Sequence, residues 1–327
     1  MPVTPHVRIL GTGHAVPEKI LTNADLEKMV DTSDQWIVER TGIRTRHIAE
    51  PGSGVAQLAT AAARRALADA GLEPGRIDLI IVGTVSGDYK FPATACLVQE
   101  QLGIENAAAF DVSAACSGFL YSLRLAESLI RTGDFRHALV IGGEVLTSMV
   151  DWSDRNTCTL FGDGAGAAVI GPSQDARGIL AMHLASDGRH SSLLINPGCG
   201  SANPPRPDNL HLHSIRMEGR EVFRHAVAAM SEGLGKVLEK SAMQLADIDL
   251  LIPHQANLRI IQAVGKKVGI AEEKVYVNVD RFGNTSAASI PIAIDEARRN
   301  GRIAPGQLVA AVTFGAGFTW AAGLIRF

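Results

Sequence analysis

Residues 107–118, Ala-Ala-Ala-Phe-Asp-Val-Ser-Ala-Ala-Cys-Ser-Gly, join an apolar, strand-like run to a helical pattern that begins at Phe119. Cys116 therefore falls at a strand-to-helix junction, among residues too small to cover its sulfur. At a helix start, unpaired N–H groups and the helix dipole favour the thiolate, which is a strong nucleophile. The competing interpretation is a buried structural cysteine, because free Cys is among the most buried residue types.

The composition sets broad limits on the kind of protein. The chain has 327 residues, 46% of them hydrophobic, and a formal net charge of −3. That length is enough for a large core in one or two domains. The near-neutral charge argues against a nucleic-acid partner. No apolar run reaches the ~20 residues of a membrane span and no signal pattern opens the chain, so we expect no membrane partner and no leader.

Cysteines and glycines give no sign of a metal or phosphate site. The cysteines show no CxxC spacing and no histidine at metal-binding spacing, so we expect reduced thiols in a cytoplasmic protein without a metal. They are Cys96, Cys116, Cys158 and Cys199. The glycine-rich segments 7–13 and 161–170 lack the GxGxxG pattern and the Lys-Ser/Thr ending of phosphate-binding loops. We expect close backbone packing in the second of them instead.

An internal repeat organises the chain. In each half, a helix (55–71, then 221–240) leads to a buried strand that begins Ile-Asp-Leu (77–80, then 248–251). A loop and helix, a short strand near an Asp, a small-residue junction, a further helix and a closing strand follow in both copies. The two short strands are expected at 110–112 and 278–280, and the closing strands at 138–141 and 309–313.

The repeat predicts two α/β halves, 1–173 and 174–327. Cys116 lies 38 residues after Asp78 (116 − 78), and Ser286 lies 37 residues after Asp249 (286 − 249). Duplication places equivalent strand ends side by side, where a shared site can form. The Pro-, Gly-, Ser- and Asn-rich stretch 171–213 is expected to supply strands and loops that link the halves, with an exposed insertion near 198–208.

His254 and Asn284 follow strands of the second half. His254 belongs to the stretch Pro253–Asn257, and Asn284 lies at that half's counterpart of the Cys116 junction. Alone, each is equally well a hydrogen-bonded core histidine or a turn residue. Together with Cys116 they suggest a thiolate that takes an acyl group from a thioester, and two neutral donors that stabilise an enolate. That chemistry forms a carbon–carbon bond.

The same residues carry a resemblance to a known family. The chain is similar from about residue 7 to Phe327 to the β-ketoacyl-[acyl-carrier-protein] synthase III family, the initiating condensing enzymes of type II fatty-acid synthesis. The matching motifs are Asp111–Gly118, PHQANLR at 253–259, FGNTSAAS at 282–289, FGDGAGAA at 161–168 and the Gly-Phe-Thr-Trp ending. The resemblance implies an α/β, thiolase-like αβαβα sandwich of two duplicated halves, assembled as a homodimer, with Cys116, His254 and Asn284 as the catalytic triad.

The resemblance also implies a ping-pong mechanism. An acyl-CoA primer, acetyl-CoA for preference, acylates Cys116; malonyl-acyl carrier protein then decarboxylates, and its enolate, held by His254 and Asn284, attacks the acyl-Cys116 thioester. The backbone N–H groups of Cys116 and Ala316 form the implied oxyanion hole, and position 316 is usually Gly in relatives. The coenzyme A thioester is a substrate, and no separate cofactor is implied.

The resemblance assigns further residues to three sites. On the sequence alone, core packing and ligand binding are equally good interpretations of Trp36, and the resemblance favours binding. The implied CoA-binding residues are Thr32, Trp36, Arg40, Arg155, Gly219 and Asn257. The implied acyl pocket is Phe91, reaching across the dimer, with Leu160, Phe223 and Phe314. The implied carrier-protein docking residues are Arg224, Arg259, Lys266 and Lys267. Arg220 and Thr159 depart from residues that some relatives carry.

Three other functions remain open at this stage. One is a related condensing enzyme of secondary metabolism that uses another acyl starter. The second is a Cys-dependent acyl-thioester hydrolase, which cleaves thioesters without forming a carbon–carbon bond. The third is a non-catalytic carrier-protein-binding subunit, which would be expected if Cys116 were replaced. The length and branching of the primer are left open by the sequence.

Overall fold

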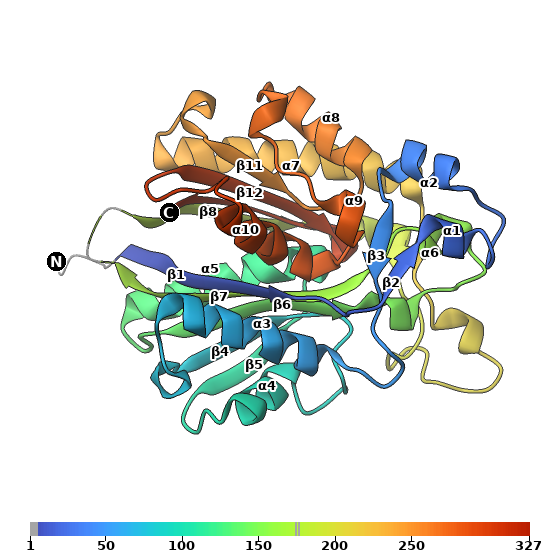
Figure 1. Ribbon diagram of the computed structural model, residues 1–327, viewed down its shortest axis with the longest axis horizontal. Coiled ribbons are helices and arrows are strands. Elements are labelled where there is room, and N and C mark those ends of the chain that lie inside the picture. The colour runs from blue at the N-terminus through green and yellow to red at the C-terminus, as the bar shows by residue number, and fades with distance from the viewer. Residues whose placement is uncertain (1–5, 174, 176) are drawn as a thin grey trace.

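The computed structural model describes residues 6–173, 175 and 177–327. Its elements form five layers, with helices outside, between and outside two β-sheets, as Figure 1 shows. The predicted αβαβα sandwich is therefore confirmed. The principal helices are α1 (Asn23–Leu26), α2 (Asp34–Thr41), α3 (Val55–Ala70), α4 (Thr94–Leu102), α5 (Gly118–Thr132), α6 (Arg155–Cys158), α7 (Gly219–Ser241), α8 (Leu258–Val268), α9 (Val279–Phe282) and α10 (Ser289–Arg299).

The first sheet has five strands in the order β1-β7-β6-β4-β5. Its strands are β1 (His6–Ala15), β4 (Leu79–Gly83), β5 (Ala108–Val112), β6 (Ala138–Val145) and β7 (Asp163–Ser173). β7 is antiparallel to both β1 and β6, whereas β4 is parallel to both β6 and β5. β4 and β6 are buried along their whole length, as expected for strands covered by helices on both faces.

The second sheet repeats this pattern in the order β8-β13-β12-β11. Its strands are β8 (Gly178–Ser186), β11 (Leu250–Pro253), β12 (Leu308–Gly315) and β13 (Thr319–Arg326). β13 is antiparallel to β8 and β12, and β12 is parallel to β11. A parallel bridge from Leu251 to Val275 stands where β5 stands in the first sheet. This match supports the division into halves 1–173 and 174–327 that we propose.

Smaller elements lie beside the two sheets. β2 (Ile20–Thr22) pairs with β3 (Thr45–His47), and β9 (Leu194–Ile195) pairs with β10 (Arg216–Met217). The segment 198–208 is largely exposed, as predicted for an insertion. Among the described residues, no helix combines the length and apolar character needed to cross a membrane.

The prediction of a short strand at 278–280 is wrong. Val279 begins the one-turn helix α9 instead, after Asn278 as its N-terminal cap. The backbone N–H groups of both residues donate to the side-chain oxygen of Gln255, at 2.9 and 3.2 Å. Because this side chain takes the donors that a strand ladder needs, the chain turns away from the sheet after the bridge at Val275.

The proposed pairing of Cys116 with Ser286 in the repeat is off by one residue. Ala115 and Ser286 each begin the short 3-10 turn that precedes a central helix, and both have a left-handed backbone, with φ of 46° and 49°. Both also lie 37 residues after the Asp that opens the repeat (115 − 78 and 286 − 249). Ala287 is therefore the counterpart of Cys116, and the second half carries no nucleophile at this position.

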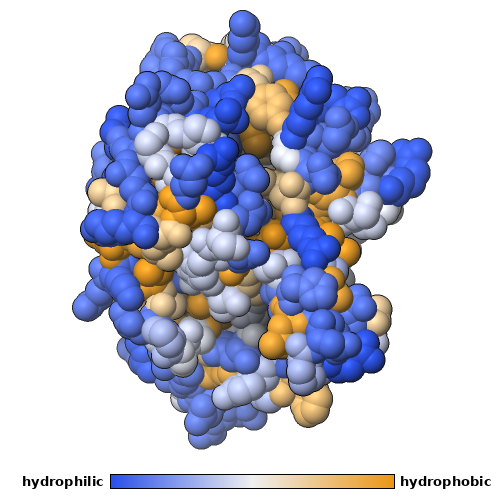
Figure 2. Space-filling model, turned by 90° about the vertical axis from the view of Figure 1, so that its right-hand side faces the viewer, coloured by the Kyte–Doolittle hydropathy of each residue, from blue (hydrophilic) through white to orange (hydrophobic). Residues whose placement is uncertain are grey.

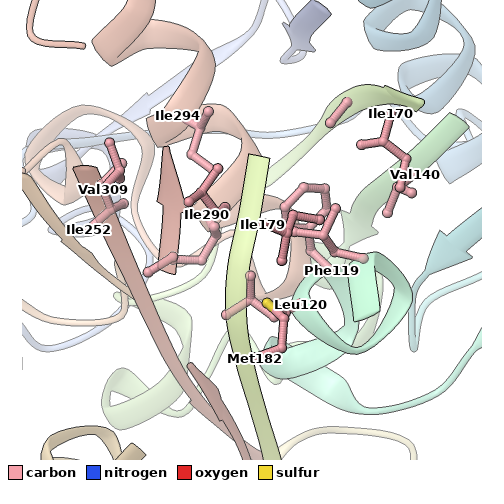
Figure 3. Close-up of a cluster of buried hydrophobic side chains, with 14 of the residues drawn as sticks. Phe119, Leu120, Val140, Ile170, Ile179, Met182, Ile252, Ile290, Ile294 and Val309 are labelled. Atoms are coloured by element: carbon pink, nitrogen blue, oxygen red, sulfur yellow. The ribbon is translucent and has the colours of Figure 1, made fainter. Parts of the chain in front are cut away.

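The central layer consists of α5 and α10, between the two sheets. Their apolar side chains meet those of both sheets in one core, shown in Figure 3. The helices begin unusually close to the strands, because a Cβ on Gly83 would lie 2.5 Å from the Gly118 carbonyl carbon, and one on Gly142 would collide with the Ala287 carbonyl oxygen. Glycine is thus required where strand ends and helix starts touch.

We expect Gly142→Ala to lower the free energy of unfolding by about 2–3 kcal/mol, because the added methyl group overpacks rigid backbone. Gly75→Ala is the matched control, since a Cβ at Gly75 meets nothing within 4 Å, and it should change stability by no more than about 0.5 kcal/mol. Denaturant unfolding of both variants measures the difference. Equal stabilities would show that the two halves do not meet as closely as described.

Candidate active site

The three residues of the expected triad line one cavity of about 790 Å³. Cys116 follows β5 in the first half, and His254 follows β11 in the second. Asn284 lies between α9 and α10, also in the second half. Because the two sheets present equivalent edges, side chains separated by more than 130 residues reach the same space (254 − 116). The cavity is therefore the candidate active site.

Cys116 is partly exposed to this cavity, so the interpretation as a sealed structural cysteine is wrong. Cys116 lies at the start of α5 as expected, and the stabilisation of its thiolate by the helix start remains a prediction. Burial raises the pKa of the Cys116 thiol to about 12, and the nearby Glu144 carboxylate raises it further, while a hydrogen bond with Ser286 lowers it. The resting residue is therefore a thiol, and it needs a proton acceptor before it attacks.

His254 is 3% exposed, and its position is held at both ends. Its backbone N–H donates to the Val312 carbonyl at 2.8 Å, and its Nδ1 atom lies 2.7 Å from the Ser289 hydroxyl. Burial lowers the pKa of the imidazole to about 3. The ring is therefore neutral at physiological pH, and Nε2 is the nitrogen available to a ligand.

Asn284 has a fixed amide orientation. Its backbone N–H donates to Leu160 O at 2.8 Å, and its own carbonyl accepts from the Gly162 N–H at 3.1 Å. Its side-chain oxygen accepts the backbone N–H of Ser286 at 2.9 Å. With that oxygen engaged, the Nδ2 group is the part of the side chain that can donate to a ligand.

The turn after β12 approaches the backbone of Cys116. A Cβ placed on Gly315 would lie 2.6 Å from the Cys116 nitrogen, so only glycine allows this contact. Ala316 follows directly and lines the same cavity. The implied oxyanion hole therefore has both of its backbone segments beside the thiol. The Ala in place of Gly leaves the N–H donor unchanged.

The implied CoA-binding residues divide into two groups. Trp36, Arg40, Gly219 and Asn257 line the cavity, whereas Thr32 and Arg155 lie outside its lining. The Arg40 and Arg155 guanidinium carbons lie 4.8 and 5.2 Å from the centre of the Trp36 ring. Both arginines are thus close enough for cation–π contact with the Trp36 ring.

Two of the implied CoA-binding residues, Asn257 and Thr32, differ in their hydrogen bonding within the protein. Asn257 caps the start of α8 by accepting the Arg259 N–H at 2.9 Å, and its amide donates to the Arg40 carbonyl at 3.0 Å. It therefore joins α8 to the end of α2. The Thr32 hydroxyl is buried and has no hydrogen-bond partner in the described part of the chain.

Three of the four implied acyl-pocket residues line the cavity, namely Leu160, Phe223 and Phe314. Phe91 does not line it, and its side chain is 86% exposed. Its expected place in the acyl pocket of a dimer partner remains a prediction. Thr159 also lines the cavity. Its hydroxyl donates to the Arg155 carbonyl at 2.9 Å, so this donor already has a hydrogen-bond partner within the protein.

The implied docking residues are all exposed. Arg259 lines the cavity from α8, and Lys266 and Lys267 lie in the last turn of that helix. Arg224 lies on α7, where its guanidinium pairs with Glu221 at 2.6 Å. Arg220, also on α7, lines the cavity. Figure 2 shows the face of the molecule to the right in Figure 1, where hydrophilic residues dominate and hydrophobic ones show in its hollows.

Three polar residues around the triad were not identified from the sequence. Glu144 is the penultimate residue of the buried strand β6 and has an exposed fraction of 0%, although a buried carboxylate is costly. Ser286 and Ser289 contact Glu144 and His254, respectively. Glu144 could have been identified from the sequence, because an acidic residue directly after the apolar run 138–141 and two glycines is unusual for a buried strand. Nothing in the spacing distinguished the two serines from helix caps.

The described residues contain no group of three or more His, Cys, Asp or Glu side chains arranged to hold a metal. The donors that line the cavity are instead a thiol, an imidazole, an amide and backbone groups. This set suits acyl transfer by a nucleophile and neutral hydrogen-bond donors.

Comparisons with known proteins agree on one family. The family models for 3-oxoacyl-[acyl-carrier-protein] synthase III and for its C-terminal part match residues 110–188 and 238–327. The β-ketoacyl-[acyl-carrier-protein] synthase III of Caldanaerobacter subterraneus is 53% identical over 98% of this chain and 97% of its own. The crystal structure of the synthase III of Aquifex aeolicus matches with a TM-score of 0.92 and 48% identity, over 98% of this chain and 100% of its own.

A relative from another pathway also matches. The priming β-ketosynthase of the R1128 polyketide biosynthetic pathway has a TM-score of 0.94 and 35% identity, over 100% of this chain and 98% of its own. The fold is therefore shared with a condensing enzyme outside fatty-acid synthesis. The synthase III proteins of Caldanaerobacter subterraneus and Aquifex aeolicus are more similar in sequence, at 53% and 48% identity.

We expect the His254 imidazole to remain neutral between about pH 5 and pH 8, because burial lowers its pKa to about 3. Nitrogen NMR of the imidazoles, with His254→Gln to identify the signals, should show no titration of this ring. Below the ordinary histidine pKa of about 6.5, the unfolded chain binds a proton that the native ring does not. As the pH is lowered below about 6.5, the free energy of unfolding should therefore decrease more steeply in the wild type than in His254→Gln. A ring that titrates near neutrality would contradict this.

Proposed function

Because the chain belongs to the β-ketoacyl-[acyl-carrier-protein] synthase III family, an acyltransferase that initiates fatty-acid synthesis, we propose that Cys116, His254 and Asn284 are its catalytic residues. The observation that carries this proposal is their position on one cavity, to which each half of the fold contributes. One half supplies the nucleophile. The other supplies two neutral donors, and neither half alone has all three.

The first half-reaction is acylation of Cys116. The sulfur attacks the carbonyl carbon of an acyl-CoA, the new carbon–sulfur bond forms, and the bond to the coenzyme A sulfur breaks. The oxygen of the tetrahedral intermediate becomes negative and is stabilised by the N–H groups of Cys116 and Ala316. The proximity of Gly315 to Cys116 supports this pairing of donors. Acetyl-CoA is the primer that we propose.

The second half-reaction is decarboxylative condensation. Malonyl-acyl carrier protein loses CO₂, and the electrons of the broken bond pass into the thioester to form an enolate. His254 Nε2–H and Asn284 Nδ2–H donate to the enolate oxygen, and the enolate carbon attacks the acyl-Cys116 thioester. A neutral imidazole suits this role, because it donates a hydrogen bond without losing a proton. The lowered pKa of His254 keeps it in that form.

The residues at and around the cavity can be assigned to the parts of a CoA thioester that they would bind. We propose that Trp36, Arg40, Arg155 and Thr32 bind the nucleotide end of CoA, and that Gly219 and Asn257 line the path of its pantetheine arm. The cation-rich surroundings of Trp36 suit an aromatic, phosphorylated group. Leu160, Phe223 and Phe314 surround the acyl chain. CoA thioesters serve as substrates, and the reaction as proposed uses no separate cofactor.

Two kinds of protein partner complete the proposal. Arg224, Arg259, Lys266 and Lys267 form a basic dock for the acidic carrier protein, which such charges steer by long-range attraction. A homodimer would cover the exposed apolar side chains of Val85, Tyr89 and Phe91, and would bring Phe91 to the partner's acyl pocket. The compartment that we propose is the cytoplasm, where thiols remain reduced.

A condensing enzyme of secondary metabolism is the second candidate, favoured by the similarity to the R1128 priming ketosynthase. The two candidates differ in the acceptor and in the acyl starter. A panel of acyl-CoA primers, offered with malonyl-carrier protein or with malonyl-CoA, separates them by product mass. A hydrolase would release the free acid and form no longer product.

We expect Cys116→Ala to abolish the acyl-enzyme and His254→Ala to retain it. The reason is that the thiol alone forms the acyl bond, whereas the imidazole acts on the enolate. Intact-mass spectrometry after addition of acetyl-CoA detects the acyl-enzyme, and product mass with malonyl-carrier protein detects condensation. Condensation by His254→Ala should fall by about 10²-fold or more.

Cys96→Ala is the matched control for thiol removal, because Cys96 lies on α4, outside the cavity lining. It should be acylated and should condense at the wild-type rate. An acyl group retained by Cys116→Ala would assign the nucleophile to another residue. Normal condensation by His254→Ala would contradict the role of His254 toward the enolate.

A further inference from the structure

Glu144 is a buried carboxylate that the proposed mechanism does not use. It belongs to β6 and has an exposed fraction of 0%. Alternate residues of a strand share a face, so Glu144 lies on the same face of β6 as Gly142, which approaches the backbone of Ala287 in the second half. The carboxylate therefore extends from the first half toward the segment that precedes α10.

The hydrogen bonds of this carboxylate reach both halves of the fold. Oε1 accepts the hydroxyl of Ser286, in the second half, at 3.1 Å, and a longer bond of 3.3 Å from the Val85 N–H. Oε2 accepts four donors from the turn after β4, namely the Thr84 hydroxyl, the Val85 N–H, the Ser86 N–H and the Ser86 hydroxyl. Glu144 thus joins the turn after a strand of one half to the start of a central helix of the other.

Ser286 connects this junction to Asn284. The Ser286 backbone N–H donates to Asn284 Oδ1 at 2.9 Å, which leaves Nδ2 of the amide as the donor for a ligand. Ser286 has a left-handed backbone, with φ of 49°, which residues other than glycine rarely adopt. The side-chain bond to Glu144 holds Ser286 against the first half in this conformation.

The direction of the Asn284 amide decides whether it can stabilise an enolate. Hydrogen bonds weaken steeply when the donor points away from the acceptor, and a displacement of about 1 Å can cost about 10²-fold in rate. The backbone of Asn284 is held by its bonds to Leu160 and Gly162, but those bonds do not set the side-chain torsions. The bond from Ser286 to Oδ1 does.

We propose that Glu144 is a positioning residue for condensation, which fixes the amide of Asn284 through Ser286 in the direction that an enolate requires. This inference rests on the proposed function, in which Asn284 is the enolate donor. Glu144 does not line the cavity. The role calls for a hydrogen-bonding partner at this place rather than for a negative charge. Acylation of Cys116 does not use Asn284, so the two half-reactions should respond differently.

The first test is Ser286→Ala, which removes the contact with Glu144 and keeps the backbone N–H that donates to Asn284. Alanine suits this left-handed position, because Ala115 has the same conformation at the equivalent place in the first half. Condensation of preformed acetyl-enzyme with malonyl-carrier protein should fall by about tenfold. Acylation, measured as release of coenzyme A from acetyl-CoA, should stay within about twofold of the wild-type rate.

Ser122→Ala is the matched control for this substitution. Ser122 lies on α5 and is fully buried, and its hydroxyl has no hydrogen-bond partner in the described part of the chain. It does not line the cavity. Loss of this hydroxyl should leave both half-reactions at the wild-type rate.

The second test compares Glu144→Ala with Glu144→Gln. Both are assayed at about pH 8, above the pKa of about 7 to which burial raises the carboxyl group of Glu144. A glutamine can accept the donors of the 84–86 turn through Oε1 while Nε2 donates to the Ser286 hydroxyl, which is also an acceptor. We expect condensation to stay within about threefold in Glu144→Gln and to fall by about 10²-fold in Glu144→Ala.

A double-mutant cycle shows whether the effect passes through Asn284. In the Asn284→Ala background, addition of Ser286→Ala should lower condensation by less than about twofold, because the group that Ser286 orients is already absent. Ser286→Ala also keeps the test decisive if Glu144→Ala fails to fold.

Condensation at the wild-type rate in Ser286→Ala, or equal losses in the two half-reactions, would overturn the proposal. So would full additivity in the Asn284→Ala background, or a loss in Glu144→Gln as large as that in Glu144→Ala. Failure of the proposed function is a separate result, because wild-type protein would then form no acyl-Cys116 or would not convert it to a longer product.

Discussion

The contact between the backbones of Gly142 and Ala287 is the constraint on which the rest of the structure depends. Gly142 lies in the middle strand β6 of the first sheet, and Ala287 precedes the central helix α10 in the other half. No side chain fits between them. The two halves therefore meet through their strand ends and helix starts, and the residues that follow those strands face a single cavity. A nucleophile from one half and two donors from the other become one site through this approach.

Burial then sets the electrostatics of that site. It keeps the imidazole of His254 neutral, keeps the thiol of Cys116 protonated and brings the carboxyl of Glu144 to the middle of the physiological range. A buried site tolerates few negative charges, so hydrogen bonds have to compensate both the thiolate and the enolate. Hydrogen-bond donors that are already oriented compensate these charges without reorganisation of the site. Ser289 and Ser286 orient the ring of His254 and the amide of Asn284, respectively.

Much of this arrangement was predictable from the sequence, because repeats and strand ends are patterns along the chain. The repeat of Ile-Asp-Leu strands predicted β4 and β11, which hold equivalent places in the two sheets. Three polar residues after expected strands predicted a shared site, and all three line the cavity. The strand predicted at 278–280 does not form, because Gln255, distant in sequence, accepts the backbone N–H groups of Asn278 and Val279. The high pKa of Cys116 was missed for a similar reason. It follows from burial and from Glu144, neither of which has a trace in the residues beside Cys116.

The central claim is that Cys116, His254 and Asn284 act on one reacting centre. A crystal structure of the acetylated enzyme with a stable malonyl-thioester analogue tests it most directly. The account predicts an acetyl group on Cys116 with its oxygen about 3 Å from the N–H groups of Cys116 and Ala316, and the analogue's thioester oxygen at the same distance from His254 Nε2 and Asn284 Nδ2. An acetyl group on another residue, or an analogue that contacts neither donor, would contradict it.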